Sequence, residues 1–342
     1  MRRIPVEKAI GEILCHDMTA IEGGRKYVAF RRGHVICERD IPQLLLMGKA
    51  HIFVWDPNVE EVHEDDAGLA GVKALAGSGV GFSGPSEGKF TLTATQDGLF
   101  TVNRAALRAL NAVPDYTAAT IPGDTPVRAG DRLAGVRIVP LVTQRSNVDQ
   151  VEALGHIHGG ILSVRSFLPL RVGIVITGGE VYSGAVADRF APVLREKTAQ
   201  FGGQILGVKV CPDDLAEIGQ AAAEFLDQGM DLIFFTGGMS VDPDDLTPEA
   251  IRQTGAHVIV QGVPIQPGNM LMLAYLGDVA LIGVPGAAIY HRITALDVIL
   301  PQIFAGGRLT GADFSRLGEG GLCLACETCT YPVCYFGKGS CG

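Results

Sequence analysis

The chain has 342 residues, a formal net charge of −9 and eight cysteines. This length predicts two or three domains with enough residues for a buried core. The acidic balance argues against a nucleic-acid partner, no apolar run approaches the ~20 residues of a membrane span, and the N-terminus lacks the apolar stretch of a signal peptide. We therefore expect a cytoplasmic protein that binds neither nucleic acid nor a membrane. Its cysteines are interpreted as thiols or metal ligands in preference to disulfides.

The first half of the sequence predicts two regions, a small β-rich domain over residues 1–56 and a mixed α+β region over residues 57–167. The elements expected in the first are strands at Tyr27–Arg31, His34–Cys37 and His51–Trp55 and a helix from Asp40 to Leu46. The acidic run Asp56–Ala67 is interpreted as a solvated connector. By themselves these regions indicate no chemistry.

The pattern changes at Arg171, where compact apolar runs of strand length begin to alternate with amphipathic helices. Such alternation is typical of a parallel sheet with right-handed crossovers. We therefore expect a doubly wound, mainly parallel α/β domain over residues 168–306. Its expected strands are 171–176, 205–210, 231–235, 257–260, 270–275 and 279–284. Its expected helices are 188–201, 213–228, 248–253 and 285 to about 303.

Three glycine-containing loops leave the carboxyl ends of three of these strands, which is where open α/β sheets bind ligands. Glycine lets the backbone approach a phosphate closely, so the loops together favour an anionic or nucleotide-like ligand. The candidate ligand-binding residues are Thr177, Gly178 and Gly179 in the first loop, Thr236, Gly237, Gly238 and Ser240 in the second, and Pro285 and Gly286 in the third.

Acids in the same loops would repel a phosphate unless a cation lies between them, and Mg²⁺ is bound in this way by one or two carboxylates together with phosphate oxygens. Glu180 and Asp245 are the candidate Mg²⁺ ligands, with Asp242 and Asp244 beside them. The alternative for Asp245 is a helix cap, because a helix is expected to begin near Thr247. Capping is also open for Asp213 and Asp214, at the start of the helix expected over residues 213–228.

Over residues 124–306 the chain resembles the molybdopterin molybdenumtransferase family, and its central domain also looks like the molybdopterin adenylyltransferases. The motifs that carry the resemblance are Ile176-Thr-Gly-Gly-Glu-Val181, Pro212-Asp-Asp214, Gly237-Gly-Met-Ser-Val-Asp-Pro-Asp-Asp245 followed by Thr247-Pro-Glu-Ala250, Pro267-Gly268, and Gly283-Val-Pro-Gly286. The resemblance implies catalytic roles for Glu180 and Asp245. It also adds Asp214, Thr247, Pro267 and Gly268 to the cofactor-binding residues.

The resemblance implies a homodimeric enzyme of molybdenum-cofactor biosynthesis that binds molybdopterin and adenylated molybdopterin and inserts molybdate with release of AMP, dependent on Mg²⁺. Three features depart from the family pattern: an Asp-Gly-Tyr-Ala signature is missing from the N-terminal half, Gln266 and Asn269 stand where the family carries lysines, and Asp242 replaces a glycine. Two alternatives therefore stay open. One is a molybdopterin adenylyltransferase, and the other is a non-catalytic cofactor carrier or insertion chaperone that serves molybdoenzyme clients.

A cysteine-rich tail occupies residues 307–342. Cys323, Cys326, Cys329 and Cys334 follow the spacing C-x2-C-x2-C-x4-C. Four thiolates this close can surround one metal, and the spacing leaves Zn²⁺ and an iron–sulfur cluster open. A flexible tail that delivers a ligand through its thiols is the alternative. Cys341 lies near the end of the tail, and the cysteines at 15, 37 and 211 are interpreted as ordinary buried residues.

Overall fold

The computed structural model describes residues 1–55, 60–240, 242–243 and 245–339. The chain forms two compact units. Unit 1 contains Met1–Thr95, Val102–Ile121 and Ala129–Ser163, and unit 2 contains Gln96–Thr101, Pro122–Arg128 and Val164–Gly342. The cysteine-rich tail is thus part of unit 2. Among the described residues, no helix is both long enough and apolar enough to cross a lipid bilayer.

The N-terminal part of unit 1 surrounds a small core that includes Leu14, Phe30, Ile36 and Leu44. Its elements are β1 (Arg2–Pro5), η1 (Val6–Lys8), β2 (Met18–Glu22), β3 (Arg25–Phe30), η2 (Glu38–Asp40), α1 (Ile41–Leu46) and β4 (His51–Val54). The strand expected at His34–Cys37 is absent: only Val35 makes a bridge, to Ile13, and β3 pairs with β2 instead.

The rest of unit 1 is a four-stranded antiparallel sheet of order β6-β7-β11-β9 with helices packed against it. Its elements are β5 (Glu61–His63), α2 (Glu64–Leu75), β6 (Val80–Ser86), β7 (Lys89–Ala94), α3 (Arg104–Ala112), β9 (Tyr116–Thr120), β11 (Arg132–Ile138), β12 (Val142–Gln144) and α4 (Arg145–His158). A further sheet, β10-β8-β13, is made of Thr125–Val127, Gly98–Val102 and Leu162–Arg165, where the chain passes in sequence from one unit to the other.

The interpretation of Asp56–Ala67 as a connector is wrong for the described residues 60–67. β5 pairs with β12, and α2 begins at Glu64 with three acids in its first turn, where they complement the positive end of the helix dipole. Gly68 then brings α2 so close to the sheet that an added Cβ would lie 2.9 Å from the Phe90 ring. A helix that is acidic at its start and small on its buried face resembles a linker in sequence.

Unit 2 is built on a six-stranded sheet of order β15-β14-β16-β19-β18-β17. Its strands are β14 (Arg171–Thr177), β15 (Gln204–Cys211), β16 (Leu232–Thr236), β17 (His257–Gln261), β18 (Met272–Leu276) and β19 (Val279–Val284). The first four in spatial order run parallel. β18 is antiparallel to β19, and β17 is antiparallel to β18. The predicted α/β domain with a mainly parallel core is confirmed here, with an antiparallel edge.

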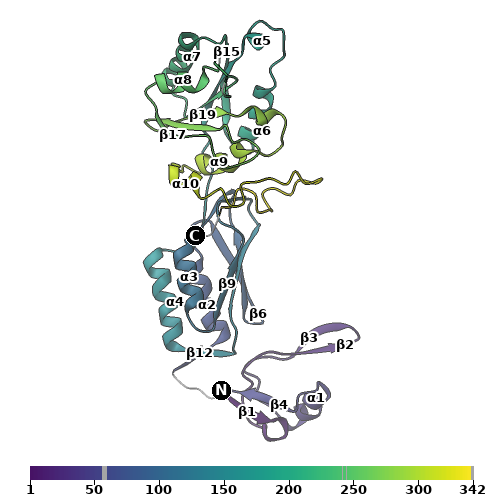
Figure 1. Cartoon of the computed structure of the whole chain (residues 1–342). Helices are drawn as coiled ribbons and strands as arrows, with labels where there is room; N and C mark the ends of the chain where they lie inside the picture. Colours follow the sequence, from purple (N-terminus) through teal and green to yellow (C-terminus); the bar gives the residue numbers. More distant parts are fainter. Residues whose placement is uncertain (56–59, 241, 244, 340–342) are drawn as a thin grey trace. The chain divides into compact units, whose positions relative to one another are not determined.

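Helices cover both faces of this sheet (Figure 1). The helical elements of unit 2 are α5 (Gly179–Tyr182), α6 (Phe190–Ala199), α7 (Leu215–Asp227), α8 (Thr247–Gln253), η3 (Gly286–Ile289), α9 (Ala295–Phe304) and α10 (Gly311–Ser315). Successive strand residues point to opposite faces, so Phe234 of β16 packs with α6 and α9 while Phe235 packs with α7 and α8. This double cover explains why the strands read as continuous apolar runs.

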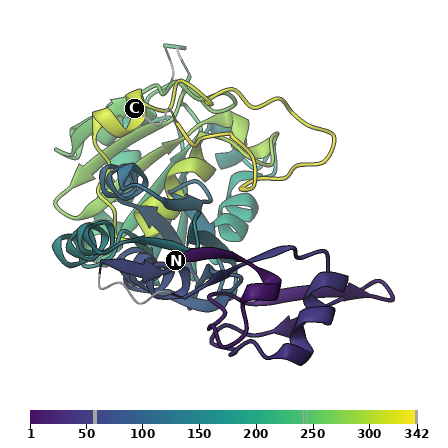
Figure 2. The ribbon, with the colours of Figure 1, turned by 90° about the horizontal axis from the view of Figure 1, so that it is seen from below.

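The single helix expected from Pro285 to about residue 303 is wrong. The chain makes the short helix η3 and then starts again at α9, where Thr294 and Asp297 form a reciprocal capping box. After α10, residues 316–339 follow an irregular path, which is the yellow loop of Figure 2. Phe336 anchors this segment in the core of unit 2, and the Tyr331 hydroxyl donates to the carbonyl of Asp297.

Candidate functional site

The three glycine loops lie along one edge of the unit 2 sheet. β14, β16 and β19 are neighbouring parallel strands whose last residues are Thr177, Thr236 and Val284, so the loops that follow leave the sheet side by side. This confirms the prediction that Gly179, Gly237 and Gly286 share one rim. We call this edge, from Thr177 to Glu180, Thr236 to Ser240 and Pro285 to Gly286, the glycine rim.

Threonine hydroxyls tie the first two loops together. The Thr177 hydroxyl donates to the carbonyl of Thr236 at 3.1 Å, and the Thr247 hydroxyl, at the start of α8, donates to the carbonyl of Gly237 at 2.8 Å. The hydroxyl oxygens of Thr177 and Thr247 are 3.2 Å apart. The Thr236 hydroxyl is buried and has no hydrogen-bond partner among the described residues. Buried hydroxyls without hydrogen-bond partners are uncommon in proteins.

Glycine at 237 is required by close approach as well as by backbone conformation. Gly237 has φ +83°, and a Cβ added there would lie 2.2 Å from the carbonyl oxygen of Thr177. Gly238 follows with φ +51°, so two consecutive residues are in the left-handed region. The backbone of this loop therefore turns sharply against the end of β14.

The third loop is linked to the second by packing. Met239 is buried against Gly283 of β19, where an added Cβ would meet the Met239 methyl at 2.5 Å. Pro285 and Gly286 then open η3, and a Cβ at Gly286 would meet no atom within 4 Å. Gly286 is thus exposed to open space at the rim, whereas Gly237 and Gly283 are enclosed.

The candidate acids Glu180 and Asp245 are exposed and half-buried, respectively, and each residue makes a hydrogen bond within its own loop. Glu180 is exposed on α5, and its carbonyl accepts the amide of Val186. Asp245 is half-buried; one of its carboxylate oxygens accepts the amide of Asp242 at 3.2 Å and closes a turn. Ser240 is exposed next to this turn. Asp244 lies outside the described residues.

Asp213 and Asp214, which follow β15, make different contacts. Asp214 caps α7, because its carboxylate accepts the amides of Ala216 and Glu217 at 2.9 and 3.0 Å. Asp213 instead accepts the amide of Gly179 at 2.8 Å and so holds the first rim loop. A ligand-binding role for Asp214 stays a prediction. Beside this pair, burial raises the pKa of the Cys211 thiol, helped by the charge of Glu217, so this cysteine is a poor nucleophile at neutral pH.

Pro267 and Gly268 lie at the tip of the β17–β18 connection and contact the start of α9 and the tail. The carbonyl of Pro267 accepts the amide of Ala295 at 3.0 Å, and a Cβ at Gly268 would lie 2.9 Å from that same nitrogen. The backbone of Gln266 pairs with the tail, accepting the amide of Cys323 at 2.8 Å. This predicted ligand loop is therefore where the tail is fastened to the domain.

The four tail cysteines are free thiols, two of them half-buried and two exposed: Cys323 and Cys334, and Cys326 and Cys329. Within the described part of the chain, their sulfur atoms do not form a group of three donors close enough to hold one ion. Cys323 and Cys334 pack against the core of unit 2. A metal at all four thiols would require residues 324–333 to draw together.

A pocket of about 700 Å³ in unit 2 was missed by sequence reasoning. It lies between α6, the residues after β19 and α9, with Tyr331 and Pro332 of the tail at its wall. Its basic side chains are Arg128, Lys197, His291 and Arg292. Lys197 is buried and bonded to Asp297 and to the carbonyl of Arg292. These side chains come from separate segments, so no local motif could have revealed them.

Comparison with known families places two matches on the chain. Residues 173–305 match the family described as "Probable molybdopterin binding domain", and residues 3–56 match a "Domain of unknown function (DUF8806)". The molybdopterin molybdenumtransferase of Synechococcus elongatus is 29% identical over 156 residues, which is 43% of this chain and 38% of that protein. A CinA-like protein of Mycobacterium tuberculosis is 35% identical over 91 residues, which is 26% of this chain and 21% of that one. The chain therefore spans well under half the length of these relatives.

Among solved structures, the molybdopterin biosynthesis enzyme MoaB of Thermus thermophilus is similar with a TM-score of 0.33 and 20% identity, covering 40% of this chain and 97% of that one. The tungsten cofactor synthesizing protein MoaB of Pyrococcus furiosus has a TM-score of 0.32 and 19% identity, covering 40% and 93%. The matched residues 173–305 contain the glycine rim. Residues 173–305 thus match the probable molybdopterin binding domain, and the chain is similar over 156 residues to a molybdopterin molybdenumtransferase.

Proposed function

We propose that the chain binds molybdopterin and its adenylated form at the glycine rim and acts in molybdenum-cofactor assembly. The observation that carries this proposal is the position of the rim: three glycine loops meet at the carboxyl ends of β14, β16 and β19, inside the residues that match the molybdopterin-binding family. Ligands of open α/β sheets bind at this end.

The backbone is the natural anion-binding element of this site. The missing side chains of Gly237 and Gly238 leave room for Thr177 and Thr247, and we propose that the amides of the turn they form bind the phosphate groups of the ligand. Thr177 and Thr247 hold that turn against β14, which keeps the amides in place before the ligand arrives. Preorganised donors of this kind stabilise charge that develops during transfer, without reorganising at the moment of reaction.

Glu180 and Asp245 fit a Mg²⁺ role in which phosphate oxygens complete the coordination. The described rim residues do not form a ready group of three metal donors, and Mg²⁺ needs only one or two protein carboxylates beside the phosphates. Asp245 uses one oxygen for the amide of Asp242, which leaves its other oxygen available. When bound, Mg²⁺ would neutralise phosphate charge. Glu180 and Asp245 would position it for release of AMP as molybdate is inserted.

The rim lacks the cations that an anionic substrate would meet in the resembled family. Gln266 and Asn269 flank Pro267-Gly268. Near the third loop, Arg189 contacts Ile289 and Tyr290, and Arg128 and Arg292 lie on the wall of the 700 Å³ pocket. This difference favours a second candidate, a non-catalytic carrier or insertion chaperone that holds the cofactor for a molybdoenzyme client. Adenylylation of the pterin at the same rim is a variant of the first candidate.

The deciding experiment incubates the purified chain with adenylated molybdopterin, Mg²⁺ and molybdate and measures AMP. Glu180→Gln and Asp245→Asn should each reduce AMP release by on the order of 10²-fold or more, with little change in thermal midpoint because both acids lie at the surface. Asp278→Asn is the matched control. Asp278 is an exposed loop acid that directly precedes β19, at the end of this strand opposite to the glycine rim.

Tight pterin binding without AMP release would support the carrier, and ATP-dependent adenylylation of the pterin would support the adenylyltransferase. A chain that neither binds the pterin nor turns it over would contradict the whole proposal. A homo-oligomer also belongs to this proposal, and sedimentation of the purified chain tests it.

For the tail, we propose a zinc or iron–sulfur site at Cys323, Cys326, Cys329 and Cys334, supported by their spacing and by their free thiols on a loop without regular structure. Protein prepared anaerobically with metal supplied should then contain about one zinc per chain or a brown, oxygen-sensitive cluster. Changing all four to Ser should remove it. Pterin binding should survive that change unless the tail closes over the rim.

A further inference from the structure

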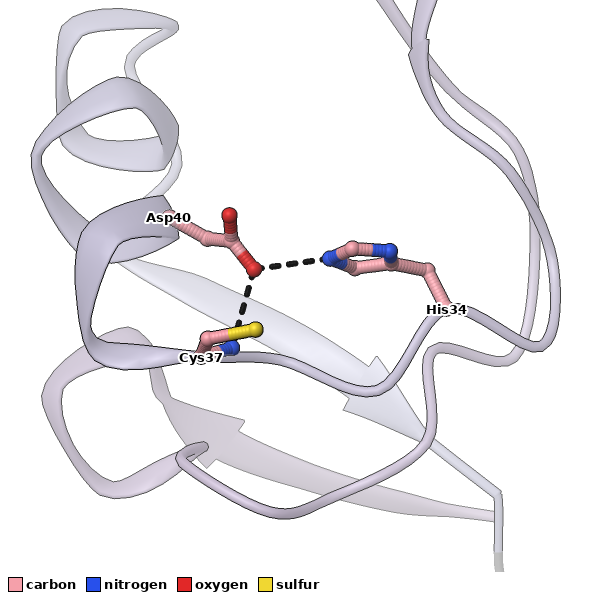
Figure 3. A group of neighbouring side chains, drawn as sticks. All are labelled: His34, Cys37 and Asp40. Atoms are coloured by element: carbon pink, nitrogen blue, oxygen red, sulfur yellow. Dashed lines mark hydrogen bonds and ion pairs between the residues drawn. The ribbon is translucent and has the colours of Figure 1, made fainter.

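Three different metal-binding side chains meet in the N-terminal part of unit 1, away from the glycine rim in sequence. His34, Cys37 and Asp40 offer an imidazole nitrogen, a thiol sulfur and a carboxylate oxygen that all lie within 4.8 Å of one another (Figure 3). His34 Nε2 is 2.7 Å from Asp40 Oδ2. Asp40 is buried, whereas His34 and Cys37 are half-buried, so the group is enclosed on one side and open to solvent on the other. The sequence interpretation of Cys37 as an ordinary buried cysteine does not fit this position.

The segment that carries the three donors is held in place by the core and by its neighbours. Ile36, between the donors, is buried, and its amide donates to the carbonyl of Glu12 at 3.0 Å. The carbonyl of His34 accepts the amide of Leu14 at 2.9 Å. The His34 ring lies against the buried Phe30, with ring centroids 5.2 Å apart. Donors fixed in this way lose little conformational freedom when they bind a ligand.

Helix capping accounts for the contacts between Cys37 and Asp40 but not for His34. Asp40 Oδ2 accepts the amide of Cys37 at 2.9 Å, and the Cys37 side chain completes a reciprocal capping box at the start of η2. The Cys37 thiol also contacts the carbonyl of Val35 at 3.5 Å. Capping does not need the imidazole. The approach of His34 Nε2 to a carboxylate oxygen that the Cys37 amide already holds is what remains to be explained.

We propose that His34, Cys37 and Asp40 form a metal site for a borderline divalent ion, with Zn²⁺ as the ion that suits the donors. Nitrogen, sulfur and carboxylate oxygen are the donors of protein zinc sites, with Zn–N and Zn–O of about 2.0–2.2 Å and Zn–S of about 2.3 Å. In a tetrahedral site such bonds place the donor atoms roughly 3.3–3.7 Å apart. The present donors are within about 1.5 Å of that spacing, so small side-chain rotations suffice.

The site has three protein donors, which leaves the fourth tetrahedral position open. Closed structural zinc sites normally use four protein ligands, whereas an open position takes water or a second molecule. The amide of Cys37 orients the Asp40 carboxylate, which is the kind of supporting hydrogen bond that metal ligands have. This site belongs to residues 3–56, the segment that matches a domain of unknown function, and it is independent of the proposed pterin chemistry.

The test uses Co²⁺ as a spectroscopic substitute for Zn²⁺ in the full chain with Cys323, Cys326, Cys329, Cys334 and Cys341 changed to Ser, so that no tail thiol is left to bind the ion. Co²⁺ should bind at about one per chain and give a thiolate-to-cobalt charge-transfer band with tetrahedral d–d bands, and Zn²⁺ should displace it. Cys37→Ser should abolish the charge-transfer band and weaken binding by at least about tenfold. His34→Gln should weaken binding similarly.

The matched control is Cys211→Ser, which removes a thiol of unit 2 and should leave the cobalt spectrum unchanged. Far-UV circular dichroism checks that each variant is folded. Absence of a thiolate band in the tail-serine chain, or a band that persists in folded Cys37→Ser protein, would overturn the proposal.

Discussion

Replacing Gly237 by Ala tests whether the first two rim loops approach each other as closely as the structure has them. At φ +83° the new side chain occupies the left-handed region, which costs about 1–2 kcal/mol for an L-residue. Its Cβ would also lie 2.2 Å from the Thr177 carbonyl oxygen, well inside the 3.4 Å at which ordinary contact begins. Overpacking of this kind adds about 1–3 kcal/mol. We therefore expect Gly237→Ala to lower the free energy of unfolding by about 2–5 kcal/mol.

Gly255→Ala is the matched control, because Gly255 has φ +81° but no atom within 4 Å of the added Cβ. It should cost only about 1–2 kcal/mol. Urea unfolding followed by far-UV circular dichroism measures both variants, and hydrogen exchange in β14 and β16 assigns the loss to unit 2. The Gly237 variant should also bind the pterin more weakly, because its loop must move away from Thr177. Equal losses of stability in the two variants would refute the close approach.

Three further predictions concern charge, tail and thiols. The hydrogen bond from Arg171, against a smaller effect of burial, lowers the pKa of Asp231, so its stabilisation is present above the unfolded-state pKa of about 3.9 and is lost as the pH falls through the lower folded value. Asp231→Asn should therefore lower the free energy of unfolding by at most about 1 kcal/mol at pH 7 and not at all near pH 2. Urea unfolding at the two pH values measures this, and an equal effect at both would contradict it. Phe336→Ala should release the tail from the core and speed proteolysis within residues 318–339, whereas Val333→Ala, at a side chain 85% exposed, should not; equal cleavage would contradict the anchoring role. In metal-free protein at pH 8, iodoacetamide should modify Cys326 and Cys329 before Cys15, since burial raises the pKa of Cys15 to about 11; mass spectrometry showing equally fast modification of Cys15 would disprove this.

The doubly wound domain was predictable because its signals are local. Strands buried on both faces must be apolar along their buried length, as in residues 172–176 and 232–235. Glycine loops after such strands must leave at the same edge when the strands are parallel. The capping residue of α7 was likewise visible as an acid before an amphipathic run. These features depend on residues within a few positions of one another, so they can be inferred before any tertiary contact is known.

Features that depend on distant partners were decided only by the tertiary structure. Residues 60–67 read as a linker because nothing local shows that β5 pairs with β12 or that α2 packs Gly68 against Phe90. Which acid of the pair before α7 contacts the rim depends on where Gly179 lies. His34, Cys37 and Asp40 face one another because the backbone pairs with residues 12–14 and the Ile36 side chain is buried in the core. Side-chain direction at these positions follows from long-range packing, and a single sequence without its partners in space carries no record of that packing.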